Sequence, residues 1–192
     1  MKLEDNNLNK IPMDRPHGTT TLTTARLTLR RHKPEDAKWL FEHFGDDDSM
    51  SRYSGWNPYK TPEMAQNTVQ QFIDGCSDPR FYAWGIESGG TLVGTIGAYD
   101  YDGGSIEVGF SVVRDYRGHG YAAEALAAVL DYLTVNEEIP RVTAWCAAEN
   151  DASRRPLEKA GMKYVATEKD GIRVGDKKYD KMYYETKKPR LA

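Results

Sequence analysis

The chain has few cysteines, little net charge and no long hydrophobic run. Cys76 and Cys146 are the two cysteines among 192 residues and form no CxxC pair, so the sequence predicts neither a disulfide framework nor a zinc site. The formal net charge of -3 lacks the basic field typical of nucleic-acid-binding proteins. No segment approaches the roughly 18 apolar residues of a membrane span, and residues 1–18 lack the apolar core of a signal peptide. We therefore expect a cytoplasmic protein that binds neither nucleic acid nor membrane.

The length of the chain suits one domain with a core of its own. Residues 1–23 are polar and rich in turn formers, and regular alternation begins only near Thr24. We predict a flexible N-terminal extension over 1–23, one domain over 24–187, and a C-terminal tail over 188–192.

Hydrophobic periodicity predicts strands and helices in a characteristic order. Strand patterns occur at 25–31, 81–87, 91–101, 106–113, 142–146, 162–169 and 180–186. Helix patterns begin near Pro34, at Thr61, near Ala122 and after Asn150. Hairpins first and a strand–helix–strand unit later predict a mixed α/β domain rather than a doubly wound nucleotide fold.

The segment from Arg117 to Ala122 predicts a phosphate-binding turn. Gly118 and Gly120 permit a tight turn whose N–H groups converge, and the following helix begins with unpaired N–H groups that favour an anion. The sequence contains no GxxxxGK[ST] motif. The segment also fails the GxGxxG pattern, because Ala123 stands where the last glycine would be. An ordinary glycine-bearing turn before a helix is the alternative interpretation.

The same segment resembles the acetyl-CoA signature of the GNAT superfamily of N-acetyltransferases. Arg117, Gly120 and Ala122 occupy the defined positions of [Arg/Gln]-x-x-Gly-x-[Gly/Ala]. The resemblance extends over residues 24–186 and is strongest to the ribosomal-protein N-acetyltransferase-like (RimJ/RimL-type) branch. Its further support is ARLTLRR at 25–31, IEVG at 106–109, and NDASRRPLEKAGM at 150–162.

The resemblance implies a fold and a reaction. The fold would be the GNAT fold of the α/β (α+β) class, a twisted, mainly antiparallel mixed sheet of seven strands flanked by about four helices. The reaction would transfer acetyl from acetyl-CoA, the donor co-substrate, to a primary amine by direct attack in a ternary complex. No metal is expected, because no cluster of His, Cys and carboxylates has ligand spacing.

The resemblance also assigns residues to the donor. The backbone of two neighbouring valines would align the pantetheine arm like an added strand, with one N–H stabilising an oxyanion. The segment Arg117 to Ala122, called the signature loop below, would hold the pyrophosphate mainly by main-chain contacts. Asn150 would form hydrogen bonds with the pantetheine amides. The complete donor-binding set is Val112, Val113, Arg117, Gly118, His119, Gly120, Tyr121, Ala122 and Asn150. His119 stands at a variable position, and a solvent-facing loop histidine is its alternative.

Two residues are candidates for chemistry. Ser153 would lie near the thioester sulfur and support or protonate the departing thiolate, and Glu107 would take the proton that an amine loses on attack, directly or through water. Capping is the alternative for Asn150 and Ser153: an Asn150 cap puts Pro156 inside the helix, whereas a Ser153 cap puts it in the first turn. A solvated or salt-bridged strand residue is the alternative for Glu107.

The acceptor is less well defined by the sequence. The segment 46–59 carries three aspartates and then Tyr53, Trp56 and Tyr59, which would attract and pack a cationic amine or form only a solvated loop. The amine would be a protein or peptide N-terminus or a small molecule, and the enzyme a monomer or homodimer. A CoA-binding or ligand-sensing module without turnover is the alternative function.

Overall fold

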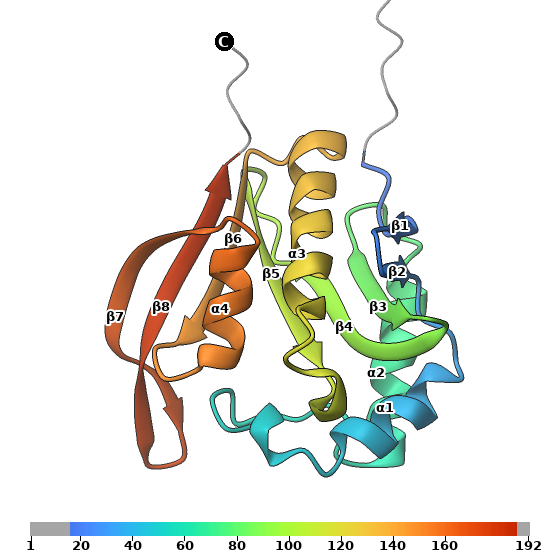
Figure 1. Ribbon diagram of the computed structural model, residues 1–192, viewed down its shortest axis with the longest axis horizontal. Coiled ribbons are helices and arrows are strands. Elements are labelled where there is room, and N and C mark those ends of the chain that lie inside the picture. The colour runs from blue at the N-terminus through green and yellow to red at the C-terminus, as the bar shows by residue number, and fades with distance from the viewer. Residues whose placement is uncertain (1–15, 188–192) are drawn as a thin grey trace, which may run out of the picture.

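An eight-stranded sheet with helices on both faces forms the body of the protein (Figure 1). The computed structural model describes residues 16–187. The strand order is β1-β2-β3-β4-β5-β6-β8-β7, and every neighbouring pair is antiparallel except β5 and β6. The strands are β1 (Leu22–Thr23), β2 (Leu27–Arg30), β3 (Tyr82–Ser88), β4 (Thr91–Tyr99), β5 (Ser105–Val112), β6 (Arg141–Ala147), β7 (Lys163–Val174) and β8 (Lys177–Lys187).

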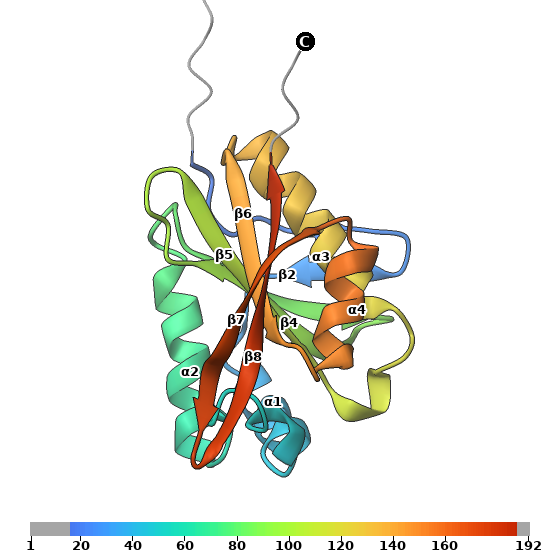
Figure 2. The same ribbon diagram turned by 90° about the vertical axis from the view of Figure 1, so that its left-hand side faces the viewer.

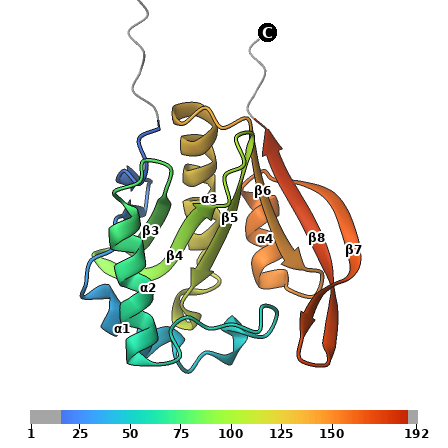
Figure 3. The same cartoon turned by 180° about the vertical axis from the view of Figure 1, so that it is seen from behind.

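Helices cover both faces of this sheet. The helices α1 (Asp36–Phe44) and α2 (Pro62–Gly75) pack on one face, whereas α3 (Tyr121–Asp131) and α4 (Asp151–Lys159) pack on the other (Figures 1 and 3). A π-helical turn, Tyr132–Asn136, continues α3, and two short 3-10 turns lie at Asp48–Met50 and Arg114–Tyr116. Each face has its own apolar core, the larger one beneath α3 and α4.

Local sequence explains several of these elements. Leu27 and Leu29 alternate with polar residues along β2 and are buried, as a half-buried strand requires. Gly89 and Gly90 have φ of 57° and 81°, which suits the tight two-residue turn joining β3 to β4. The Thr61 side chain accepts the N–H of Met64 and caps α2, as the sequence predicts.

The parallel pair β5 and β6 is paired over only a short stretch. Three residues of β5, Ser105 to Glu107, pair with Arg141 to Thr143 of β6. Beyond that point the two strands diverge, as seen from the α1–α2 side (Figure 3). The remainder of β5, Val108 to Val112, is paired with β4 but has no β6 partner. The sheet therefore opens in its middle between two of its own strands.

Two sequence-based predictions of extent need correction. The sheet has eight strands instead of seven, because β1 pairs with β2 through only Leu22 and Thr23, too short a segment to show a period. The folded body also begins before Thr24: Trp84 donates to the carbonyl of Thr20 at 2.6 Å, and Thr19 is fully buried. Residues 16–23 are therefore part of the domain, whereas 1–15 and 188–192, which belong to the predicted extension and tail, lie outside the described residues.

The start of α4 resolves the two capping alternatives. Asn150 is the N-cap: its side-chain oxygen accepts the N–H of Ser153 at 3.3 Å, and its carbonyl accepts that of Arg154 at 2.9 Å. Pro156 therefore lies inside the helix, where it cannot donate to the carbonyl four residues earlier. The first-turn placement that a Ser153 cap would have given to Pro156 is wrong.

The elements at the two ends of the domain differ slightly from their predicted bounds. The α1 helix begins at Asp36, after a turn that contains Pro34. The hairpin of β7 and β8 is longer than predicted, since its exposed outer strand lacks apolar alternation.

Among residues 16–187, no helix has the length and apolar character needed to cross a membrane.

Candidate active site

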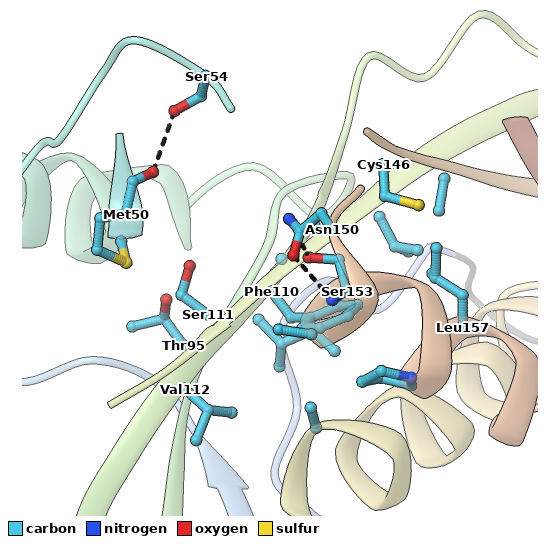
Figure 4. A pocket seen from close by; sticks show the side chains of 18 of the residues that line it. Met50, Ser54, Thr95, Phe110, Ser111, Val112, Cys146, Asn150, Ser153 and Leu157 are labelled. Atoms are coloured by element: carbon cyan, nitrogen blue, oxygen red, sulfur yellow. Dashed lines mark hydrogen bonds between the residues drawn. The ribbon is translucent and has the colours of Figure 1, made fainter. Parts of the chain in front are cut away.

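A cleft of about 1110 Å³ enters the molecule where β5 and β6 diverge. One wall comes from the start of α4, and the opposite wall from the segment between α1 and α2. Figure 4 shows Asn150 and Ser153 on the first wall, Met50 and Ser54 on the second, and Ser111 of β5 between them. The cleft thus joins the two faces of the sheet through the gap between the strands.

The signature loop lies at one end of this cleft. Gly118 and Gly120 have φ of 82° and 83°, a left-handed conformation that side-chain-bearing residues rarely adopt. Gly120 is the N-cap of α3 and has no capping side chain, so the first N–H groups of α3 have no partner within the helix. A Cβ at Gly118 would meet no protein atom within 4 Å, so the space in front of the loop is open. This geometry suits an anion such as a pyrophosphate.

The Arg117 side chain points toward the α1–α2 segment. Its guanidinium donates to Asp47 Oδ2 at 2.6 Å, to Ser49 Oγ at 2.8 Å and to the carbonyl of Val112 at 2.8 Å. Asp47 also accepts from Arg114 at 2.7 Å, and its side chain is 2% exposed. Burial raises the pKa of Asp47, but the hydrogen bonds from Ser49 and Arg114 and the charge of Arg117 outweigh it and lower the pKa to about 2.

These contacts occupy two charged groups, Arg117 and Asp47. The positive charge of Arg117 is balanced by Asp47, so the loop offers an anion chiefly its N–H groups. Asp47 is likewise occupied, and it does not stand free to attract a cationic amine. Asp48 lies near Lys60, with 3.6 Å between Oδ1 and Nζ, and Asp46 is exposed.

The two valines at the end of β5 differ in position. Val112 lines the cleft on the unpaired side of β5, whereas Val113 is buried in the core beneath α1 and α2. The N–H of Val113 donates to the carbonyl of Val93 at 3.0 Å and is therefore engaged with β4. An oxyanion would thus meet the Val112 side of β5. His119 is exposed, stacks on Tyr121 with 5.6 Å between ring centroids, and is not a lining residue of the cleft.

Asn150 and Ser153 lie together on the α4 wall. The Asn150 amide Nδ2 donates to Ser153 Oγ at 3.0 Å, so the serine oxygen accepts this bond and its own O–H is free to donate elsewhere (Figure 4). Both residues line the cleft and both are partly buried. Capping and a place in the cleft are therefore compatible for this pair.

Glu107 lies at the point where β5 and β6 separate. Its Oε1 accepts the indole N–H of Trp145 at 2.9 Å, and the hydroxyl of Tyr99 is bonded to the same carboxylate. Burial and the negative charge of Glu107 raise the pKa of Tyr99 above its usual range, so this phenol stays neutral. Tyr99 and Trp145 line the cleft, whereas Glu107 is not a lining residue.

Two neighbours of the site were not predicted to belong to it. Arg26 donates to the carbonyl of His119 at 2.9 Å and pairs with Glu124 of α3, so it braces the signature loop from outside. Cys146 lines the cleft as a buried thiol next to the α4 wall, and burial raises its pKa to about 11. Both positions depend on segments that are distant in sequence, so spacing alone does not reveal them.

The β7–β8 hairpin contacts the segment between α1 and α2, although none of its residues lines the cleft. The tip of the hairpin reaches the α1–α2 segment (Figure 2), where the rings of Tyr53 and Tyr179 meet edge to face at 5.1 Å. The Tyr53 hydroxyl also donates to the carbonyl of Glu149 at 3.2 Å.

Within the described part of the chain, no group of three or more His, Cys, Asp or Glu side chains is arranged to hold a metal ion.

Known proteins are similar to this chain in sequence and in fold. Residues 26–163 match the acetyltransferase (GNAT) domain family. The uncharacterized N-acetyltransferase YoaA of Bacillus subtilis (strain 168) is 30% identical over 173 residues, which cover 88% of this chain and 97% of YoaA.

Solved structures agree with the sequence match. A GNAT-family acetyltransferase from Bacillus anthracis superposes with a TM-score of 0.77 at 27% identity, covering 88% of this chain and 99% of that one. The ribosomal L7/L12 α-N-protein acetyltransferase RimL, solved with coenzyme A, shares the fold with a TM-score of 0.78 at 14% identity, over 88% and 98% of the two chains. The chain is a GNAT-family N-acetyltransferase with RimL-type enzymes among its structural neighbours.

Proposed function

We propose that the protein transfers an acetyl group from acetyl-CoA to a primary amine by direct attack within a ternary complex. The observation that carries this proposal is one continuous cleft that contains the glycine loop, the unpaired edge of β5 and the Asn150–Ser153 pair. Each part matches one section of the donor: an anion site for the pyrophosphate, a strand edge for pantetheine, and a hydroxyl for the sulfur.

The donor would bind along the α4 side of the cleft. The N–H groups at the start of α3, with those of Gly118 and Gly120, would hold the pyrophosphate, since they have no partner within the helix. The open edge of β5 near Val112 would bond the pantetheine amides as a further strand, and Asn150 would face them from α4. Tyr121 and Ala122 line this end of the cleft and would contact the phosphates through their backbone.

The transfer itself needs a proton acceptor and a proton donor. The neutral amine nitrogen attacks the thioester carbonyl, the C–S bond breaks, and the nitrogen loses a proton. We assign the uptake of that proton to Glu107, through a water molecule because Glu107 does not line the cleft, whereas its hydrogen-bond partners Tyr99 and Trp145 do. Ser153 would donate its free O–H to the departing thiolate.

The acceptor would enter from the side of α1, α2 and the β7–β8 hairpin. Two classes of amine fit, a protein or peptide N-terminus and a small molecule. RimL-type neighbours favour the first, as the name of the L7/L12 α-N-protein acetyltransferase states for that enzyme. Fold alone does not choose between them.

Release of free thiol from acetyl-CoA, measured across a panel of small amines and N-terminal peptides, tests the proposal. Turnover of at least one amine with saturation in both substrates is expected. Measurable CoA binding without turnover of any amine would instead identify a CoA-binding or sensing module. Absence of CoA binding would overturn both functions.

A further inference from the structure

Two large aromatic residues of the cleft lining are exposed to solvent. Trp56, in the segment between α1 and α2, is 63% exposed, and Tyr99, at the end of β4, is 46% exposed. Both line the cleft. Large apolar surface that stays in contact with water inside a concave site is typical of a place where a ligand binds, because covering it releases that water. We therefore asked which part of a substrate these rings would meet.

The Tyr99 ring is held in its place over β5. A Cβ at Gly109 of β5 would lie 2.7 Å from the Tyr99 hydroxyl and 3.4 Å from its ring, so a side chain at this position would displace the ring. The Tyr99 hydroxyl is bonded to the carboxylate of Glu107. Glycine and glutamate together therefore fix the ring beside the proposed base.

Trp145 presents a second ring on the same face of the sheet. Its neighbours in β6, Ala144 and Cys146, are buried in the core beneath α3 and α4. Because side chains alternate along a strand, Trp145 projects to the opposite face, that of α1 and α2. Its indole is the second partner of Glu107, and it also lines the cleft. An amine that passes its proton to Glu107 would thus react beside two aromatic rings.

Uncharged lining residues on this side add mostly apolar surface. Thioether and ring surface continues along the α1–α2 segment, α2 and the start of β3 through Met50, Phe72 and Phe81. Ser54 donates its hydroxyl to the carbonyl of Met50 at 3.2 Å (Figure 4), and Gln71 is exposed at the α2 end. The polar groups of this wall are thus either bonded within the wall or open to water.

The charged groups on this side do not favour an acceptor with a second positive charge. Asp47 is held in its ion pairs with two arginines. The Lys181 ammonium lies 4.5 Å from the centre of the Trp145 ring, so a cation already occupies that ring. Arg52 and Glu149 are exposed lining residues of opposite sign. A neutral group therefore fits this side better than a second ammonium.

We propose that the acyl acceptor carries a neutral aromatic group beside its amine, and that Trp56, Tyr99 and Trp145 bind this group. The inference rests on the proposed acetyl transfer and names a substrate class for it. An arylalkylamine and a peptide with an aromatic first residue share this chemistry. Trp56 is a specificity-determining residue in this role, because its exposed ring can be removed without disturbing the core or the bonds of Glu107.

Amines that differ in the group beside the nitrogen provide the test. The pairs are phenethylamine with ethylamine, diaminobutane with butylamine, and a tetrapeptide beginning with phenylalanine with one beginning with alanine. Thiol release gives kcat/KM for each amine in the wild type, in Trp56→Ala and in Trp56→Phe, which keeps a ring. Tyr164→Ala is the matched control, since this aromatic residue is 54% exposed but lies on β7 and does not line the cleft.

The wild type is expected to favour the aromatic member of the first or the third pair by about tenfold or more, and to gain nothing from the second ammonium of diaminobutane. The first and third pairs distinguish a small molecule from a peptide as the source of the aromatic group. Trp56→Ala should remove most of the preference and leave kcat/KM for the smaller partner, and the KM for acetyl-CoA, within twofold. Trp56→Phe and Tyr164→Ala should retain the preference.

Three results would overturn this inference alone. They are equal kcat/KM within both aromatic pairs, a preference for diaminobutane over phenethylamine, and a preference that Trp56→Ala leaves unchanged. Absence of turnover with every amine would overturn the proposed transfer and this inference together.

Discussion

Asn150 and Ser153 share the first turn of α4 but have separable roles. Asn150 caps the helix with its side-chain oxygen and holds Ser153 Oγ with its amide. Ser153 contributes no capping bond from its side chain, so its hydroxyl is available to the cleft. The residue types alone fit both roles for both residues, and only the direction of each hydrogen bond separates them.

We predict different losses when each of the two is replaced by alanine. Ser153→Ala should lower kcat about tenfold, as expected when one hydrogen bond to a charged group is lost, with the melting temperature almost unchanged. Asn150→Ala should remove a helix cap and cost about 1 kcal/mol of stability, and it should weaken CoA binding as well. Thermal melts and steady-state kinetics distinguish the two. A large stability loss in Ser153→Ala with normal kcat would contradict the assignment.

Replacement of Glu107 by glutamine should lower kcat by roughly 10²–10³-fold while leaving the affinity for acetyl-CoA within twofold. Glutamine keeps an oxygen for the Trp145 indole, so the fold should survive, but it cannot take a proton. Glu168→Gln is the matched control, since that carboxylate lies on exposed β7 and bonds Tyr183. A wild-type rate in Glu107→Gln would remove it as the base.

Residue types and spacing predicted several of the residues that line the cleft. They did not predict which side chains these residues bond to. Arg117, Gly118, Gly120, Asn150 and Ser153 line one cavity, as their motifs indicate. The pairing of Arg117 with Asp47 was not predictable, because it depends on how a distant loop folds back.

At the scale of elements, the turn into α3 depends on backbone conformation more than on side chains. Gly120 has φ of 83° at the helix N-cap, and an added Cβ there would approach Arg26 to 3.4 Å. Space is therefore sufficient, and the obstacle to a side chain is the left-handed conformation. The pattern of the sequence predicted this turn, and the strand and helix that flank it, correctly.

Gly120→Val should abolish CoA binding, because a β-branched residue would shift the turn out of the left-handed region and scatter the N–H groups. Gly89→Val is the control: Gly89 also has positive φ and an open surrounding, but it lies in the β3–β4 turn. Calorimetric titration with CoA should show binding in the control and none in Gly120→Val. Similar binding in both variants would contradict the anion-binding role of the turn.

Elements without periodicity were the ones that the sequence predicted least well. The two residues of β1 are too few to alternate, and β7 is exposed along most of its length. Hydrophobic patterning reports burial, so it is silent on a strand that pairs through backbone hydrogen bonds alone. The strands β2 to β6, the strand β8 and the four helices carry buried residues and were found, whereas only the first part of β7 was predicted.

At the scale of the whole molecule, one buried carboxylate connects the two sides of the cleft. Asp47, in the segment between α1 and α2, bonds Arg114 and Arg117 beside the signature loop. The wall expected to face the acceptor is therefore fastened to the loop expected to bind the donor. We therefore expect a substitution at either end of this contact to affect the other end.

The stabilising effect of Asp47 should depend on pH. Its pKa is lowered in the folded state to about 2, so the stability that it contributes is present above the ordinary pKa of an aspartate and is lost as pH falls toward 2. Asp47→Asn should therefore be less stable than the wild type at pH 7, and the difference should shrink below about pH 4. Urea unfolding at several pH values measures it. A difference that is constant with pH would show that Asp47 acts through packing alone.

The open edge of β5 has a consequence for the life of the protein in a cell. A donor that adds itself to that edge binds only folded chains, and at a hundred times its dissociation constant it would add about 2.7 kcal/mol to their stability. Proteases act on the unfolded population, which shrinks about a hundredfold under those conditions. The abundance of the enzyme would then rise and fall with the acetyl-CoA supply, so that nutrient status would set its level with no dedicated regulatory site.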